Sequence, residues 1–285
     1  MSRVPARAAV LLLVLTAGCG ASRPSGPNGE ATRGPRQILS DAEGALARAR
    51  SFRLQASGVD RSGALALTLA VSTPGKLMLT IDHGPQTESL ILAGGSAYIQ
   101  ANRSFWSQQV GARAAALLSG RWIKAPTQAG LGGLNFLTDP MHRARCLLGS
   151  HVGTVTKGGS ANVGGRPAVV IATSGDAPGS APGRLYVAAS GAPVPLRAVQ
   201  TGPTHPGAPL DRSCGQSTPD TTRHSDTTFS DYDKPLAIAP PKGAVDISKL
   251  QPGGNGGGGG GGGGTPPSSH NNPVARARLA VAPAS

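Results

Sequence analysis

Few residues of this chain combine the type and spacing that a catalytic site requires. Asp231 and Asp233 flank Tyr232 and would point to one face of a strand, where two carboxylates could act as acid and base or bind a cation. A solvated sheet edge is the commoner explanation of such a pair. Ser150 and His151 are adjacent along the chain, and adjacency does not place the imidazole on the hydroxyl of its neighbour.

Other enzyme and metal-site motifs are absent or incomplete in the sequence. Gly130-Leu-Gly-Gly133 is a fragment of a dinucleotide-binding fingerprint, but no strand leads into it and the last glycine is missing, so we interpret it as a hinge loop. No nucleophile elbow, zinc-protease helix, phosphate loop or Cys-x-x-Cys pair occurs. The histidines lie mostly in predicted loops without a second ligand at a useful spacing: His83, His142, His151, His205, His224 and His270. We expect no enzymatic activity, no cofactor and no metal site.

The first eighteen residues have the organisation of a signal peptide. Arg3 and Arg7 precede an apolar run from Ala8 to Ala17, which as a helix would span only about 15 Å of a hydrocarbon core about 30 Å thick. A charged start, a short apolar stretch and small residues at its end are typical of an export signal rather than a membrane span.

The end of this signal, Leu15-Thr16-Ala17-Gly18-Cys19, resembles the lipobox of bacterial lipoproteins, with Thr16 at the position that usually holds Leu. The resemblance implies cleavage before Cys19 and a thioether from Cys19 to diacylglycerol, with palmitate-type acyl chains. Two or three such chains suffice for stable anchoring, because each buried CH₂ contributes about 0.8 kcal/mol. The expected location is the outer face of the cytoplasmic membrane.

The two remaining cysteines, Cys146 and Cys214, are an even pair in an oxidising compartment, which favours a disulfide. The bond would close a loop of 214 − 146 = 68 positions and stabilise the fold by about 4 kcal/mol. Two free buried thiols are the alternative.

The chain is strongly basic, with a net charge of +13, yet its Lys and Arg residues are scattered and do not alternate with aromatic residues. We therefore expect no nucleic-acid binding. Attraction to anionic lipid headgroups or to an anionic envelope polymer is a better use of this charge, unless the arginines simply solvate the surface.

An amphipathic helix is predicted from Pro35 to Arg50, because Pro suits a first helical turn and apolar residues recur every three or four positions. Alternating apolar and polar residues then predict five strands at 52–59, 64–72, 76–82, 88–93 and 97–101. This pattern indicates an antiparallel meander with one apolar face, which helices or a ligand must cover.

The second half of the chain mixes short helices and strands. Helices are predicted at 110–118 and 139–148, with an extended piece at 122–124 between them. Further strands are predicted at 153–157, 168–173, 184–188, 195–200 and 227–232. Gly158-Gly159 reads as a turn, and Cys214 would tie down a polar loop from Gly202 to His224.

Composition changes set the expected boundaries. They are a signal peptide at 1–18, a lipidated Cys19 with a flexible tether at 19–36, one domain at 37–250 and a disordered Gly-rich tail at 251–285.

Local phrases within the predicted domain resemble the LppX/LprG-type lipoproteins, relatives of the LolA-like lipid carriers. The phrases are Gly95-Ser-Ala-Tyr-Ile99 with Phe105-Trp106, Leu117-Leu118-Ser-Gly-Arg-Trp122, Gly183-Arg-Leu-Tyr-Val187 with Pro195-Leu-Arg197, and Phe229-Ser-Asp-Tyr232 with Pro240-Pro241 and Val245-Asp-Ile-Ser-Lys-Leu250. The resemblance implies an α+β fold, in which a curved antiparallel sheet forms a half-barrel around helices. It also implies that a lipid or lipoglycan binds between them.

Eight residues are the candidates for lining such a cavity, and they would face one side of the meander: Leu65, Leu67, Leu69, Leu77, Leu79, Ile81, Leu90 and Leu92. Ordinary core packing explains each of them as well. The leading hypothesis is a membrane-anchored protein that binds or carries a lipid or other amphiphile. The alternatives are a non-enzymatic sensor or structural module with a packed core and, third, a hydrolase whose site is assembled from distant residues.

Overall fold

The computed structural model describes residues 26–60, 63–127, 135–149, 153–205, 214 and 224–246. The predicted signal peptide, Cys19, the predicted hinge loop at 130–133, the Ser150-His151 pair and the glycine-rich segment at 251–285 lie outside these residues. None of the described helices is both long and apolar enough to cross a membrane.

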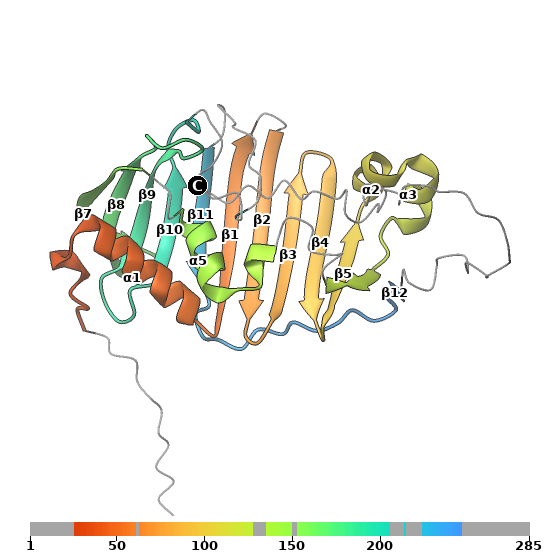
Figure 1. The fold of residues 1–285 in the computed structure, drawn as a ribbon, viewed down its shortest axis with the longest axis horizontal. Coiled ribbons are helices and arrows are strands. Elements are labelled where there is room, and N and C mark those ends of the chain that lie inside the picture. Colours follow the sequence, from red (N-terminus) through yellow and green to blue (C-terminus); the bar gives the residue numbers. More distant parts are fainter. Residues whose placement is uncertain are drawn as a thin grey trace, which may run out of the picture.

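One curved sheet of twelve strands organises the described residues (Figure 1). Its spatial order is β12-β6-β5-β4-β3-β2-β1-β11-β10-β9-β8-β7, and the contact between β12 and β6 is its one parallel pairing. The strands are β1 (Ser51–Asp60), β2 (Gly63–Ser72), β3 (Lys76–His83), β4 (Gln86–Ala93), β5 (Ser96–Ala101), β6 (Ile123–Pro126), β7 (Val155–Val163), β8 (Arg166–Ser174), β9 (Pro182–Ala188), β10 (Pro195–Gln200), β11 (His224–Ser230) and β12 (Val245–Asp246). The predicted fold class, a curved antiparallel sheet packed on helices, is confirmed.

The register of the strands places apolar residues of neighbouring strands opposite one another. One row of paired residues crosses five neighbouring strands. It runs from Leu54 of β1 through Leu69 of β2, Leu79 of β3 and Leu90 of β4 to Ile99 of β5. Because side chains opposite one another share a face, this row is a continuous apolar stripe on the concave side. On the other side of Leu54, Phe229 of β11 extends the stripe.

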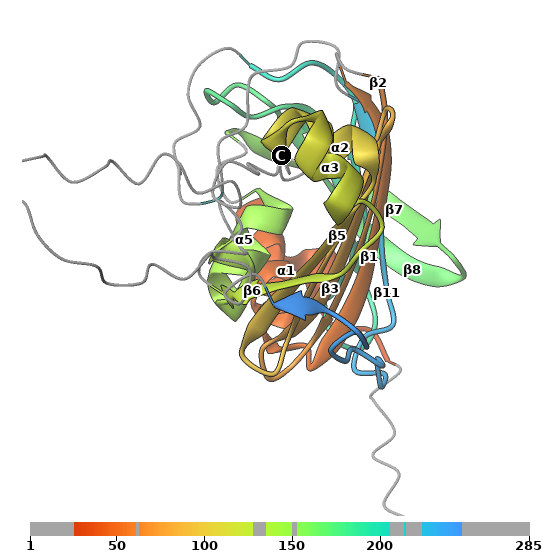
Figure 2. The ribbon, with the colours of Figure 1, turned by 90° about the vertical axis from the view of Figure 1, so that its right-hand side faces the viewer.

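The helices lie on the concave face of the sheet (Figure 2). They are α1 (Pro35–Arg48), α2 (Arg103–Val110), α3 (Ala112–Leu118) and α5 (Pro140–Leu148), with short 3-10 turns η1 (Glu30–Thr32) and η2 (Asn135–Leu137). Side-chain caps set two of the starts, because Asn102 accepts from Phe105 N and Asp139 accepts from His142 N. The main core therefore lies between α1, α2, α5 and the concave face.

A second, smaller cluster lies on the opposite face of the sheet. The segment after β11 contributes Ile238, which packs with Ala70, Ile91 and Tyr98. This return segment leads to β12, which pairs with β6 at the edge of the sheet. It protects part of the convex face from water.

The structure corrects several predicted boundaries. The helix predicted at 110–118 is α3 at 112–118, and it is preceded by a helix that was not predicted, α2 at 103–110; Gly111, with a φ of 83°, separates the two. Gly158-Gly159 is an irregularity within β7 rather than a turn, because the pairing shifts there while the strand continues to Val163. The predicted strand at 227–232 occupies 224–230, so Asp231 and Asp233 lie in the following turn, both with left-handed backbone.

The tether expected at 19–36 is also shorter than predicted. The Asn28 side chain donates to the carbonyls of Ala188 and Gly191 at 2.8 and 3.1 Å, and Glu30 is only 1% exposed. Residues 26–34 therefore belong to the folded domain, and they run directly into α1.

Candidate ligand-binding face

The eight predicted cavity residues lie together on the concave face. Leu69, Leu77, Leu79, Ile81, Leu90 and Leu92 are between 2 and 7% exposed and belong to the main core, while Leu65 and Leu67 are partly buried against it. The structure thus brings the set together as part of a packed interior. A role in ligand binding remains a prediction for each of them.

An apolar hollow lies elsewhere on the same face, between the helices and strands β7–β11. Leu39 of α1 and Leu147 and Leu148 of α5 form its helical side, and Ile171 and Leu185 form part of its sheet side. Its cavity volume is about 50 Å³, whereas pockets for drug-sized ligands hold about 300–1,000 Å³. Thr173, Gln200 and Ser225 add polar atoms to the lining, and the Ser225 Oγ has no hydrogen-bond partner among the described residues.

Arg143 of α5 is a buried cation inside the main core. It is 4% exposed, and its guanidinium carbon lies 5.7 Å from the centre of the Phe52 ring. One nitrogen, Nη1, donates to the Leu137 carbonyl at 2.8 Å, while Nε and Nη2 have no hydrogen-bond partner among the described residues. Burial lowers the pKa of the guanidinium and the nearby Asp139 carboxylate acts in the opposite direction, yet an arginine stays charged.

Burial of this charge is costly for the free protein. A charge that forms no ion pair costs several kcal/mol when it leaves water. The Leu137 hydrogen bond and the cation–π contact with Phe52 offset about 1.5–3 and about 2 kcal/mol of that cost, but two nitrogens still lack a hydrogen-bond partner among the described residues. The core therefore contains two donor nitrogens suited to an anion.

Glu88 of β4 is a second ionisable group on the apolar face. It pairs with Ile81 and Ala101 and shares its face with Leu90, two residues further along the strand. Removal from water raises the pKa of its carboxyl to about 8. Glu88 was not among the predicted site residues, although its spacing of two and four positions from Leu90 and Leu92 is the sequence signal that places it on their face.

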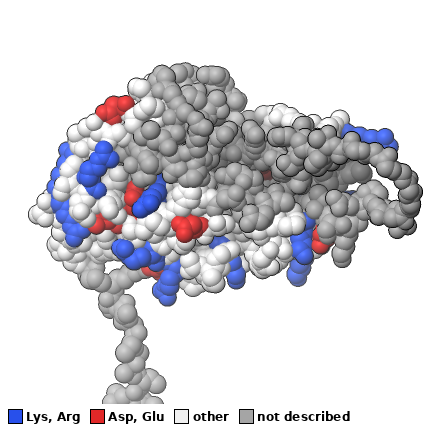
Figure 3. Space-filling view, viewed as in Figure 1, with Lys and Arg blue, Asp and Glu red and all other residues white. Residues whose placement is uncertain are grey.

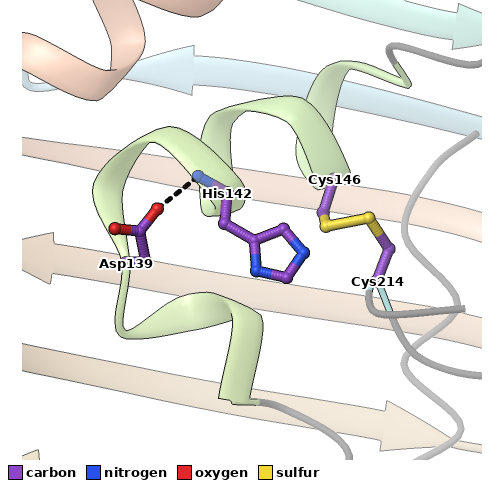
Figure 4. The surroundings of a disulfide bond; sticks show 4 residues. All are labelled: Asp139, His142, Cys146 and Cys214. Atoms are coloured by element: carbon purple, nitrogen blue, oxygen red, sulfur yellow. Dashed lines mark hydrogen bonds between the residues drawn. A yellow bond between two sulfur atoms is a disulfide. The ribbon is translucent and has the colours of Figure 1, made fainter. Parts of the chain in front are cut away.

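Cys146 of α5 and Cys214 form the disulfide expected from the sequence, with their Cα atoms 5.2 Å apart (Figure 4). His142 lies one helical turn before Cys146, and its ligand atoms and those of the two cysteines lie within 4.8 Å of one another. The two sulfur atoms are bonded to each other, so they are not available as thiolate ligands. The bond instead fixes α5, and with it Leu147, Leu148 and Arg143, to a residue 68 positions away.

The predicted carboxylate pair is engaged in structural contacts. Asp231 lies 3.2 Å from Arg53 and 3.0 Å from Lys234, and these cations lower the pKa of its carboxyl. The Asp233 carboxylate accepts the backbone N–H of Arg50 at 2.7 Å. Together these bonds attach the turn after β11 to the start of β1.

No protein-family model and no curated protein matches the chain. Similar solved structures include LprF from Mycobacterium bovis, with 15% identity over 76% of this chain and 99% of that one, at a TM-score of 0.45. Lipoprotein LppX from Mycobacterium tuberculosis has 11% identity over 72% of this chain and 97% of that one, at a TM-score of 0.44. A LolA superfamily protein from Nitrosomonas europaea has 10% identity over 72% of this chain and 95% of that one, at a TM-score of 0.25.

The sequence phrases described above resemble the same kinds of protein, the LppX/LprG-type lipoproteins and the LolA-like carriers. Since these TM-scores lie below 0.5, the fold class rests on the strand order and register of this chain rather than on the likenesses.

Glu88 makes stability depend on pH. Its pKa is higher in the folded than in the unfolded chain, where it lies near 4.3, so the folded state resists ionisation as the pH rises. The contribution of Glu88 to the free energy of unfolding is therefore greatest below about pH 4, and it falls as the pH rises to about 8. We expect Glu88→Gln to raise the free energy of unfolding at pH 8 by about 2–4 kcal/mol and to change it little at pH 4.

Urea unfolding at both pH values measures this difference. Asp82→Asn is the matched control, since Asp82 is an exposed carboxylate on the neighbouring strand. An equal gain for Glu88→Gln at both pH values would contradict the ionisation argument.

Proposed function

We propose that the chain is a lipid-anchored extracytoplasmic protein that binds or carries an anionic amphiphile. The acyl part would occupy the concave face beneath α1 and α5, and the anionic part would bind Arg143. The observation that carries the proposal is a guanidinium, 4% exposed, with two nitrogens that have no hydrogen-bond partner among the described residues of an apolar core. An anionic amphiphile would supply the negative charge that the guanidinium lacks, and its acyl chain would suit the apolar surroundings.

The apolar hollow supports a place for the acyl chain. Its small lining residues Ala181 and Ala198 leave space beside Leu185 and the α5 leucines. Because its volume is about 50 Å³, a whole acyl chain requires α1 or α5 to move away from the sheet. The eight leucine and isoleucine residues of β2–β4 would then extend the same surface.

The packed core also favours a second function, that of a non-enzymatic sensor or structural module. Phe52, Leu69, Leu79 and Val187 are at most 2% exposed, as side chains of an ordinary packed interior are. On this hypothesis the chain contacts a protein or an anionic envelope polymer through its surface, and Arg143 is only a costly part of the core.

The proposed anchor is Cys19. Mass spectrometry of the mature N-terminal peptide should find the chain beginning at Cys19 with diacylglycerol and acyl additions. An unmodified peptide, or one that retains residues 1–18, would exclude the anchor without bearing on the ligand.

Arg143→Met separates the ligand hypothesis from a structural role. Replacing a buried charge by an apolar side chain should raise the free energy of unfolding by about 1–3 kcal/mol. The same change should weaken binding of palmitate about tenfold or more and leave its neutral methyl ester unaffected. Displacement of a fluorescent fatty acid and urea unfolding measure the two effects.

Arg145→Met is the control, because Arg145 is exposed on the same helix. A destabilised Arg143→Met protein with unchanged palmitate affinity would support the sensor or structural module.

The position of the acyl chain is tested by one substitution at two sites of the concave face. Ala198→Leu fills the hollow, whereas Ala56→Leu adds the same atoms beside Leu67 on β1. We expect Ala198→Leu to weaken binding of palmitate about tenfold and Ala56→Leu to change it less than about threefold. The reverse order would place the chain on the predicted leucine face instead.

A further inference from the structure

The N-terminal segment is attached at one particular edge of the sheet. Gly191 N donates to the Gly26 carbonyl and Asn28 N to the Ala189 carbonyl, both at 3.1 Å. Residues 189–194 form the turn between β9 and β10. In this antiparallel arrangement, turns 73–75, 94–95, 164–165 and 231–234 lie at the same edge, which we call the anchor edge. The chain therefore enters the domain at the anchor edge.

The distance from Cys19 to this edge is limited by chain length. Seven peptide units separate Cys19 from Gly26, because 26 − 19 = 7. Even when fully extended, they span at most about 25 Å. An acyl anchor at Cys19 therefore holds the anchor edge within about 25 Å of the lipid surface, whereas the opposite edge lies a strand length farther away.

Basic residues gather at the anchor edge, namely Arg48, Arg50, Lys76, Arg166 and Lys234. Blue side chains project along the corresponding lower border in Figure 3. Asp231 and Asp233 are in the same region, but Arg53, Lys234 and Arg50 already contact their carboxylates. Arg48 and Arg166 are exposed and form no ion pair with any described residue.

Arg48 and Arg166 also line a cleft at this edge. The cleft has a volume of about 820 Å³ and lies between the last turn of α1 and the turns after β7, β9 and β11. Phe229 and Tyr232 line its interior, and the Tyr232 hydroxyl donates to the Pro195 carbonyl at 2.6 Å. The space is large enough for a lipid headgroup, and guanidinium groups match the geometry of a phosphate.

We propose that the anchor edge docks on the membrane surface, with the phosphate of an anionic lipid headgroup bound in this cleft by Arg48 and Arg166. The proposal rests on the lipid anchor at Cys19, but not on the acyl ligand or on Arg143. The short connection keeps the anchor edge close to the lipid surface. The basic residues then favour the orientation in which this edge faces the membrane over free rotation of the domain about its anchor.

The test uses the full acylated chain in vesicles of phosphatidylcholine, with and without phosphatidylglycerol. A fluorophore is attached at Thr73→Cys on the anchor edge or at Gln108→Cys on α2, and nitroxide-labelled headgroups quench it. With phosphatidylglycerol, the label at position 73 should be quenched several-fold more than the label at position 108. Arg48→Glu with Arg166→Glu should lower the docked-to-free ratio at least about tenfold, and high salt should do the same.

Arg103→Glu with Arg113→Glu is the matched control, because both arginines are exposed on α2 and α3 and the charge change is identical. Equal quenching at positions 73 and 108 in an acylated chain would overturn docking. If the difference in quenching between positions 73 and 108 were the same with and without phosphatidylglycerol, headgroup binding would be overturned. The same holds if the Arg48→Glu/Arg166→Glu and Arg103→Glu/Arg113→Glu variants changed that difference equally. A chain whose mass shows no acyl addition would overturn the anchor and this inference together.

Discussion

The concave face of the sheet must be kept from water, and the remaining structure depends on this constraint. Register joins apolar residues of neighbouring strands into continuous rows, such as the row from Leu54 to Ile99. Short helices cover these rows, and none of α1, α2 or α5 would be stable alone in water at its length. The disulfide from Cys146 and the caps at Asn102 and Asp139 hold this cover in place.

The sequence predicts the meander well because alternation and glycine turns are local signals. Strands β1–β5 begin and end within two residues of their predicted positions. The second half was harder to predict, since pairing with a distant partner sets its boundaries. Gly158-Gly159 has the composition of a turn, yet β8 pairs on both sides of it. Asn28 gave no local signal, because its partners Ala188 and Gly191 are more than 150 positions away.

The candidate site was predicted in part. The leucines of β2–β4 share the predicted face, and the two cysteines meet as expected. Arg143 escaped notice because Arg143 and Arg145 both resemble the exposed face of a short amphipathic helix, and only the packing of α5 on the sheet distinguishes them. The hollow likewise depends on residues from elements that are distant in sequence, such as Leu39 and Ala198.

Burial has different consequences for the two ionisable residues on the concave side, Glu88 and Arg143. Glu88 can become neutral, and its pKa of about 8 means that the core accepts it as an acid. Arg143 cannot lose its charge in this way, so its burial remains a cost in the free protein. In an interior of low dielectric constant, the attraction between the guanidinium and the proposed anion would be much stronger than in water. The burial that destabilises the free protein would then strengthen the proposed complex, a balance that a binding protein requires and a purely structural core does not.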